Sequence, residues 1–242
     1  MKHFISIIIP IYNDHTTIDN TIETLISFFN TENIDAEIIV VNDGGKDNGV
    51  QIVQEKIKKY SLIKLINRKK NKGKGYSVKE GLKMAKGDFI FYTDADLPYL
   101  TKPIGEMLNL LKNKEADLIL ANREFYKTDY HKKTSLPRHI THKIYSFFVR
   151  TLLPIEFCDT LAGLKGMRKE IAAAIVPKLT IDRFSFDVEL LLIAKKMGVK
   201  IMEMPVSLKN VGKSNLSITK DAPQMAKDII KIFIQNKKGM YG

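Results

Sequence analysis

Two aspartates, Asp94 and Asp96, follow an apolar run that ends at Thr93 in the segment FYTDADLPYL. Two carboxylates at this spacing can hold a divalent cation, because Mg²⁺ and Mn²⁺ bind hard oxygen ligands. Such a cation can neutralise the charge that develops as a diphosphate leaves. Asp, Ala and Pro are also ordinary turn residues, so a simple turn is the alternative for this pair taken alone.

Two further acidic residues follow other apolar runs. Asp43 ends the second run, in VVNDGGKDN, and Asp14 comes just after the first, in IPIYND. In an open parallel sheet, ligands bind outside the carboxyl ends of the strands. Solvation alone does not require acidic residues after three different strands, so this grouping favours a ligand site over a turn.

The elements that must position these residues alternate along the chain. Short apolar runs predict strands at 4–11, 37–41, 62–66, 88–93, 117–121 and 199–206. Amphipathic spacing predicts helices at 16–29, 50–60, 75–86, 102–112, 138–153, 185–197 and 225–234. This order indicates an α/β fold with a mostly parallel sheet and helices on both faces. The segments 124–136 and 207–220 are polar and loop-like.

Composition limits the classes of protein and of partner. The 242 residues are 44% hydrophobic, which indicates a globular chain, and we find no repeat or linker that would divide it. The 39 basic against 27 acidic residues, a net charge of +12, favour an anionic partner such as nucleic acid, anionic lipid or a phosphorylated substrate. The single cysteine, Cys158, excludes an intrachain disulfide and a zinc site built on cysteine pairs.

A glycine-containing segment, NKGKGYS (71–77), lies between the third predicted strand and the third predicted helix. Its glycines allow close backbone approach, and the amino terminus of the helix favours anions. The spacing of a Walker loop is absent, and a solvated loop is the alternative.

Several segments give the chain a specific resemblance. SIIIPIYND, VVNDGGKDN, NKGKGYSVKEGLKMAKGDFIFYTDADLP and RFSFDVELLLIAKKMG resemble, in this order, the blocks of family 2 glycosyltransferases with the GT-A fold. CDTLAGLKGM resembles the D-T-x-x-G-F-K block, and VGKSNLSI the G-S-K-V segment, of dolichyl-phosphate sugar synthases such as dolichyl-phosphate β-glucosyltransferase. The resemblance covers nearly the whole chain. It implies one Rossmann-like catalytic domain over 1–242, with a nucleotide-sugar half (1–122) and an acceptor half (123–242).

The resemblance also implies roles for individual residues. Those implied to bind the nucleotide-sugar are Pro10, Tyr12, Asp14, Asp43, Lys74, Asp94, Ala95, Asp96, Lys165 and Lys213. Within this set, Asp43 would bind the base, Lys165 and Lys213 would approach phosphates, and Asp94 and Asp96 would hold Mg²⁺ or Mn²⁺.

The chain departs from the family pattern at three places. The family usually has Glu at the position of Asp14, and its D-D-G-S becomes Asn42-Asp43-Gly44-Gly45. Pro98 stands where the mannosyl branch usually has Gln, which argues against a mannosyl enzyme.

The acceptor decides which catalytic groups are needed. A phosphate monoester has a second pKa of about 6, so at neutral pH it is a nucleophile that needs cations rather than a base. Arg123 and Arg138 are the candidate cations. The alternative role of Arg123 is a structural ion pair, and Arg138 would otherwise be a solvated arginine near the start of a helix. A sugar hydroxyl would need a base. Asp187 and Glu189 in FSFDVELL are the candidates, and Asp187 stays the candidate for the site unless it only stabilises the first turn of its helix.

We therefore expect an inverting, metal-dependent hexosyltransferase that moves glucose from UDP-glucose to a polyprenyl or dolichyl phosphate at the cytoplasmic face of a membrane. The alternatives are a family 2 enzyme that glycosylates a saccharide hydroxyl, and a nucleic-acid-binding protein, for which we find no recognised motif. No run reaches the about 20 apolar residues that span a bilayer, so membrane contact would be peripheral. The basic, apolar helices near 138–157 and 223–238 would make that contact, or would simply cover the core.

Overall fold

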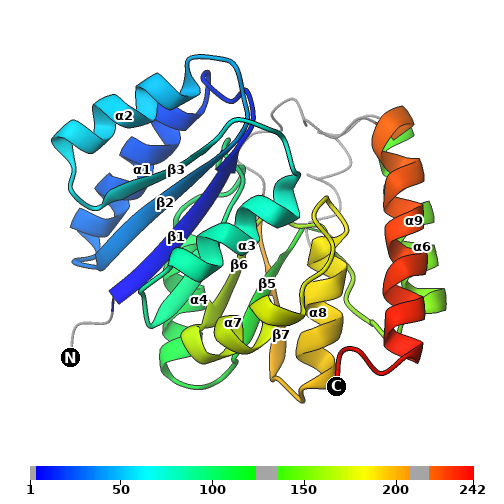
Figure 1. Ribbon diagram of the computed structural model, residues 1–242. Helices are drawn as coiled ribbons and strands as arrows, with labels where there is room; N and C mark the ends of the chain where they lie inside the picture. The colour runs from blue at the N-terminus through cyan, green and yellow to red at the C-terminus, as the bar shows by residue number, and fades with distance from the viewer. Residues whose placement is uncertain (1–3, 124–135, 208–217) are drawn as a thin grey trace.

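The computed structural model describes residues 4–123, 136–207 and 218–242, with side chains at 136–143 and 218–220 excepted (Figure 1). The strands are β1 (Phe4–Ile11), β2 (Asp35–Asp43), β3 (Ile63–Arg68), β4 (Phe89–Tyr92), β5 (Leu118–Asn122), β6 (Lys165–Arg168) and β7 (Ile201–Pro205). The helices are α1 (Ile18–Thr31), α2 (Gly49–Lys59), α3 (Lys74–Met84), α4 (Lys102–Lys112), α6 (Leu136–Leu152), α7 (Lys169–Ile175), the 3₁₀ helix η2 (Val176–Lys178), α8 (Phe186–Lys196) and α9 (Ile218–Lys237).

The described strands form one sheet in the order β3-β2-β1-β4-β6-β5-β7. The pairs β1–β2, β1–β4, β2–β3 and β5–β7 are parallel, whereas β6 is antiparallel to both β4 and β5. The α/β class and the mostly parallel sheet are thus confirmed. The carboxyl ends of β1, β2, β3, β4 and β5 meet at one edge, and this edge carries the candidate site.

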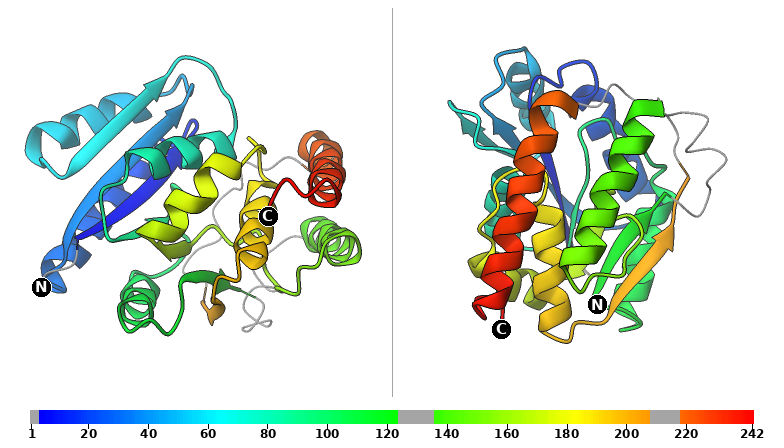
Figure 2. Two further views of the ribbon diagram at one scale, coloured as in Figure 1. Left: turned by 60° about the horizontal axis from the view of Figure 1, so that its bottom comes forward. Right: turned by 90° about the vertical axis from the view of Figure 1, so that its right-hand side faces the viewer.

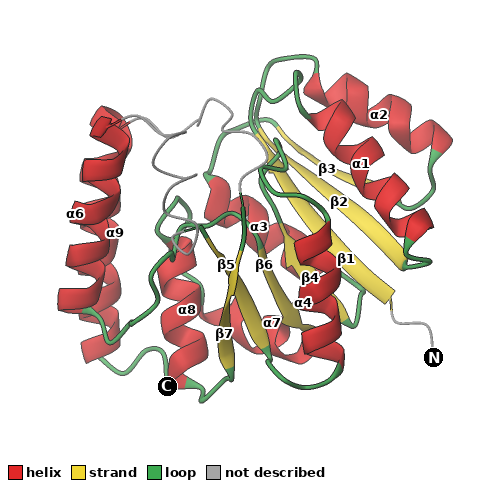
Figure 3. Cartoon of the chain, turned by 180° about the vertical axis from the view of Figure 1, so that it is seen from behind, coloured by secondary structure: helices red, strands yellow, loops and turns green. Residues whose placement is uncertain are grey.

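Helices cover both faces of the sheet because its strands alternate between two apolar cores. Ile5, Ile7 and Ile9 pack in the core beneath α1 and α4, and Ile8 and Ile39 pack in the core beneath α3, α7 and α8. Figure 1 shows α3, α7 and α8 in front of the sheet, and Figure 3 shows α1, α2 and α4 on its other face. Burying each such Ile or Val contributes about 1.5–3 kcal/mol, so the strand ends project from a rigid support.

The helices α6 and α9 lie side by side at one end of the molecule, outside α8 (Figure 2). On α6, Tyr145 and Val149 face the core, whereas Ile144, Phe147 and Phe148 are exposed. Among the described residues, no helix is both long and apolar enough to cross a bilayer.

The structure corrects several predicted boundaries. The sequence pattern does not predict β6, α7 or η2. β6 has only four residues and begins and ends with a basic side chain, and α7 and η2 have only seven and three residues, too few for a clear period. The last helix begins at Ile218 rather than near 225 and contains Pro223. Most of the two polar segments predicted as loops, residues 124–135 and 208–217, lies outside the described residues.

Candidate active site

The carboxyl edge of the sheet brings together side chains from six elements. They are Tyr12 and Asp14 after β1, Asp43 at the end of β2, Lys74 at the start of α3, Asp94 and Asp96 after β4, Arg123 after β5, and Lys165 at the start of β6. Because β6 is antiparallel, its first residue lies at this edge. Pro10 is the half-buried last-but-one residue of β1, and the Tyr12 side chain is exposed to solvent.

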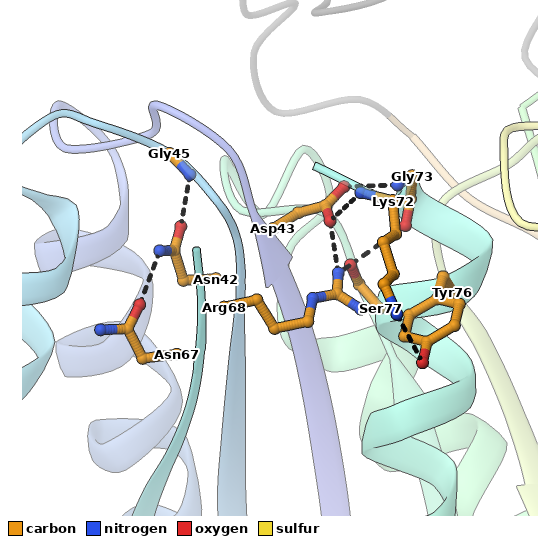
Figure 4. Close-up of polar contacts among 9 residues, drawn as sticks. All are labelled: Asn42, Asp43, Gly45, Asn67, Arg68, Lys72, Gly73, Tyr76 and Ser77. Atoms are coloured by element: carbon orange, nitrogen blue, oxygen red, sulfur yellow. Dashed lines mark hydrogen bonds and ion pairs between the residues drawn. The ribbon is translucent and has the colours of Figure 1, made fainter. Parts of the chain in front are cut away.

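Asp43 is buried and joins β2 to the segment before α3 (Figure 4). Its carboxylate accepts hydrogen bonds from the backbone N–H groups of Lys72 and Gly73, at 2.8 and 2.7 Å, and from the guanidinium of Arg68. Arg68 also donates to the Ser77 hydroxyl. Asp43 therefore fixes the shape of the glycine-containing segment as well as facing the edge where a base would bind.

Sequence reasoning missed Arg68, although a signal was present. Arg68 ends β3 as Asp43 ends β2, and the two residues are directly opposite in the parallel register. The carbon at the centre of the guanidinium lies 4.7 Å from the centre of the Tyr76 ring, and the Lys72 ammonium lies 4.2 Å from the same ring (Figure 4). Two cations are thus held beside one aromatic ring at the proposed nucleotide side.

The glycines of the 71–77 segment allow its backbone to pack closely against other residues of the protein. A side chain at Gly73, whose φ is +109°, would overlap the carbonyl of Asp182, and one at Gly75 would lie 2.6 Å from Cβ of Phe186. The backbone N–H of Tyr76 donates to that same Asp182 carbonyl at 2.9 Å. The first turn of α3 is therefore packed against other parts of the chain.

The departure from D-D-G-S has a structural counterpart (Figure 4). The Asn42 side chain donates to Oδ1 of Asn67 at 2.9 Å and accepts from the backbone N–H of Gly45 at 3.0 Å. A Cβ at residue 45 would lie 2.8 Å from the backbone nitrogen of Asn13. Asn42 and Gly45 are therefore linked by a hydrogen bond, and a serine in place of Gly45 would need the Asn13 turn to move.

Asp94 and Asp96 lie in the turn after β4, which is tied to α1 by a 2.8 Å hydrogen bond from the Thr21 hydroxyl to the Ala95 carbonyl. The Lys74 ammonium lies 2.5 Å from Oδ1 of Asp94. Burial favours the protonated acid, but the charges of Lys74 and Arg123 outweigh it and lower the pKa of Asp94.

Asp96 has the opposite environment. Burial and the negative charges of Asp94 and Asp14 raise the pKa of Asp96 to about 6, against a smaller opposing effect of Lys74. Burial is the largest cause and the two nearby carboxylates add to it, and a bound cation would offset both effects. This fits a divalent metal ion, with Asp94 and Asp96 as the protein ligands. Among the described residues, no group of three or more His, Cys, Asp or Glu is arranged to hold one, so the diphosphate and water would complete the coordination.

Arg123 follows β5 at the same edge of the sheet and is held by Asp159. Its backbone N–H, Nε and Nη2 donate to the Asp159 carboxylate at 3.0, 2.6 and 2.7 Å. The structural ion pair considered as the alternative thus exists, and it also orients the guanidinium. The structure does not place two of the predicted site residues, because the side chain of Arg138 and the whole of Lys213 lie outside the described residues.

Lys165 and Asp187 meet in the interior. The Lys165 ammonium is fully buried and donates to Oδ1 of Asp187 at 2.5 Å and to the carbonyls of Thr160 and Ala162 at 3.0 and 2.9 Å. The Tyr92 hydroxyl donates to the same Asp187 oxygen at 2.6 Å. With three N–H groups and three acceptors in the chain, Lys165 could bind a phosphate directly only by breaking one of these bonds.

Glu189, two residues after Asp187, is also buried and has a structural role. Its carboxylate accepts from the backbone N–H groups of Thr180 and Ile181, at 2.9 and 2.8 Å, and from the Tyr241 hydroxyl at 2.8 Å. It therefore secures the segment that packs on the glycine-containing segment, and it joins the carboxyl-terminal Tyr241 to it.

Comparison with known proteins identifies the family of the chain. The family model described as glycosyl transferase family 2 matches residues 6–176. A dolichyl-phosphate beta-glucosyltransferase of Dictyostelium discoideum is 30% identical over 98% of this chain and 76% of its own length. The enzyme of the same name from Saccharomyces cerevisiae is 28% identical, with the same coverage of both chains.

Solved structures share the fold at lower identity. A glucosyl-3-phosphoglycerate synthase of Mycobacterium tuberculosis superposes with a TM-score of 0.67 at 16% identity, over 96% of this chain and 80% of that one. Its complex with Mn²⁺, UDP-glucose and phosphoglyceric acid gives 0.66 at 17% identity, over 98% and 80%. These likenesses show the GT-A fold, as the sequence resemblance implied.

Proposed function

This chain belongs to glycosyltransferase family 2, and from that premise we propose that it transfers glucose from UDP-glucose to a polyprenyl or dolichyl phosphate, with inversion and with Mg²⁺ or Mn²⁺. The single observation that carries the proposal is the match, over 98% of the chain, to relatives named dolichyl-phosphate beta-glucosyltransferase. The catalytic domain would extend over the whole chain, with the nucleotide-sugar half at 1–122 and the acceptor half at 123–242.

On the nucleotide side, Asp43 would accept a hydrogen bond from the base, beside the stacked Arg68 and Tyr76. Pro10, Tyr12 and Asp14 would line the base and ribose pocket. Asp94 and Asp96 would hold the cation, which when bound offsets the charge of the departing diphosphate. Lys74 would remain beside Asp94 and add a second positive charge close to that diphosphate.

On the acceptor side, the chain would hold and orient a phosphate that needs no base. The dianion at neutral pH is already a nucleophile, and its repulsion by the donor diphosphate is the main obstacle. Arg123, fixed by Asp159, would bind it, and Arg138 and Lys213 are proposed to assist. The Asp187 carboxylate is bonded to Lys165 and Tyr92, which favours a phosphate acceptor over a saccharide hydroxyl that would need this residue as a base.

We place the enzyme at the cytoplasmic face of a membrane, with α6 and α9 in peripheral contact with the lipid. Phe147 on α6 is 67% exposed, and its neighbours Ile144 and Phe148 form the same outer stripe. On α9, the exposed Ile230 and Ile234 alternate with exposed lysines, a pattern suited to an anionic surface. Cys158 is a free thiol, which fits a reducing compartment.

A labelled-donor assay tests the proposal directly. The protein would be mixed with UDP-[¹⁴C]glucose, Mn²⁺ and a polyprenyl phosphate in detergent, and then extracted with organic solvent. We expect the label to enter the organic phase as a product that mild acid cleaves. In a parallel reaction with an oligosaccharide in place of the polyprenyl phosphate, label transferred to that oligosaccharide would instead support the saccharide acceptor. GDP-mannose and UDP-GlcNAc serve as competing donors.

A further inference from the structure

The antiparallel strand β6 lies between the strands that lead to the two halves of the proposed site. Lys165, its first residue, is opposite Tyr92 of β4 and Leu120 of β5. β4 leads to Asp94 and β5 to Arg123. Because β6 runs the other way, the segment 159–164 that precedes it lies at the carboxyl edge, between those two residues.

This segment contacts both halves. At its start, Asp159 holds the backbone and guanidinium of Arg123. Near its end, Gly163 packs directly on Asp94, so closely that a Cβ on residue 163 would overlap Oδ2 of that aspartate. The segment thus forms a direct protein connection between Asp94 and Arg123, and most of its residues are buried, so a change in its conformation would alter the separation of these two side chains.

The buried Lys165 side chain holds this segment in place through hydrogen bonds. Its ammonium donates to the carbonyls of Thr160 and Ala162, in the middle of the segment, and to Oδ1 of Asp187. Asp187 in turn accepts from Tyr92, so the pair is anchored to β4 as well as to α8. An apolar side chain would fill the same buried space without the cost of desolvating a charge, which means that the hydrogen bonds are the reason for a lysine here.

We propose that Lys165 and Asp187 are positioning residues that hold the segment 159–164, and through it set the separation of Asp94 and Arg123. The proposal rests on the function proposed above, which places the donor at Asp94 and the acceptor at Arg123. In this proposal Lys165 does not contact a phosphate and Asp187 does not abstract a proton. Neither residue would touch a substrate.

The test uses the double variant Lys165→Met/Asp187→Asn. Removing both charges avoids leaving one buried charge unpaired, and the new amide keeps a carbonyl oxygen that can accept from Tyr92. We expect kcat to fall about 100-fold, because misplacing reacting groups by about 1 Å has that effect. The Kd for UDP in EDTA and the acceptor KM should stay within about threefold, because each half remains intact. Amide hydrogen exchange should accelerate in 159–164 and not in β1 or β2.

A matched control comes from the same sheet. Lys64 and Glu37 form an ion pair of equal length, 2.5 Å, at the other end of the strands, with Glu37 buried. The variant Lys64→Met/Glu37→Gln should also cost stability and should leave kcat unchanged. This control separates loss of a sheet ion pair from loss of the positioning contact.

Other outcomes would overturn the proposal. If Lys165 contacts the donor phosphates, the double variant will weaken UDP-glucose binding about tenfold or more and leave exchange in 159–164 unchanged. If Asp187 is a base, Asp187→Asn alone will leave only a residual kcat, and that residual kcat will lack the acidic limb of the wild-type kcat–pH profile. If the double variant does not fold, Tyr92→Phe takes its place: we expect kcat to fall about tenfold with unchanged UDP affinity, and an unchanged kcat refutes the proposal.

The exchange and UDP-binding measurements use no acceptor. They therefore report on the segment even if the wild-type protein fails to label a polyprenyl phosphate, a failure that would count against the proposed function alone. The kcat comparison is then made with whichever acceptor the wild-type protein uses.

Discussion

Gly163 presents its bare Cα to the carboxylate of Asp94, and no side chain could be added there without overlapping Oδ2. The variant Gly163→Ala must therefore displace either the segment or the aspartate. We expect transfer activity to fall about 100-fold, because the proposed cation ligand moves, with a loss of about 1–3 kcal/mol in the free energy of unfolding. Steady-state kinetics and urea unfolding on the same preparation measure both.

The control for this substitution is Gly105→Ala in α4. A Cβ there would lie 3.6 Å from the Phe28 ring, an ordinary contact. Alanine in a helix should add about 0.5–1 kcal/mol of stability and leave activity unchanged. Full activity in Gly163→Ala would mean that Asp94 does not need its observed position.

Removing the Asp96 carboxylate should remove the dependence of donor binding on metal. In Asp96→Asn, we expect calorimetry with UDP-glucose to give the same Kd with and without Mn²⁺, and kcat/KM to fall about 10³-fold. Asp35→Asn, at an exposed position at the start of β2, is the control and should keep the Mn²⁺ effect. Persistence of that effect in Asp96→Asn would show that the cation binds elsewhere.

The raised pKa of Asp96, about 6, makes stability depend on pH in a definite direction. The unfolded chain releases this proton near pH 3.9 and the folded protein holds it to about pH 6, so the metal-free protein loses stability as pH rises between about 4 and 6. Asp96→Asn cannot titrate. We therefore expect the free energy of unfolding of the variant, relative to that of the wild type, to increase by about 1–2 kcal/mol as the pH rises through this window, after allowance for solvent screening.

Urea unfolding in EDTA at pH 4 and pH 7 measures this difference. A stability gap that is the same at both pH values would contradict the prediction. In the wild type, Mn²⁺ competes with the proton, so its affinity should rise through the same pH window.

Much of the fold could be predicted because the strands bury both faces. Runs such as Phe4–Ile11 are apolar along their length, and the structure places a strand there. The rule failed at β6, where Lys165 is fully buried but satisfied by hydrogen-bond acceptors elsewhere in the chain. A buried, paired lysine cannot be distinguished from a surface lysine by local pattern.

The candidate site, like the fold, was predictable in part. The position of Asp43, Asp94 and Asp96 after strands was enough to predict one shared edge. The partners of Asp187 were not predictable, because Tyr92 and Lys165 come from distant parts of the chain and meet Asp187 only after the sheet forms. For the same reason, the contact of Gly73 with Asp182 could not be predicted from the glycine-containing segment alone.

Arg123 offers a test of the acceptor side alone. Arg123→Lys keeps the charge but loses the two-point contact with Asp159, because an ammonium cannot form it. We expect the acceptor KM to rise about tenfold with the Kd for UDP unchanged. Arg168→Lys, whose guanidinium pairs with exposed Glu170 at the opposite end of β6, is the control. Equal effects on donor and acceptor would place Arg123 outside the acceptor site.

The outer stripe of α6 should carry the membrane contact. Phe147 and Phe148 are both exposed, so replacing them with serine should not disturb the core. If both rings enter the lipid boundary, Phe147→Ser/Phe148→Ser should weaken binding to anionic vesicles by about 100-fold or more, since each buried ring contributes at least about 1.5 kcal/mol when fully inserted. Vesicle sedimentation measures the change, and Met84→Ser, an exposed apolar residue on α3, is the control. Transfer to a short, water-soluble polyprenyl phosphate should be retained, because the site itself is intact. Unchanged vesicle binding in the double variant would refute the assignment of α6 as the contact helix.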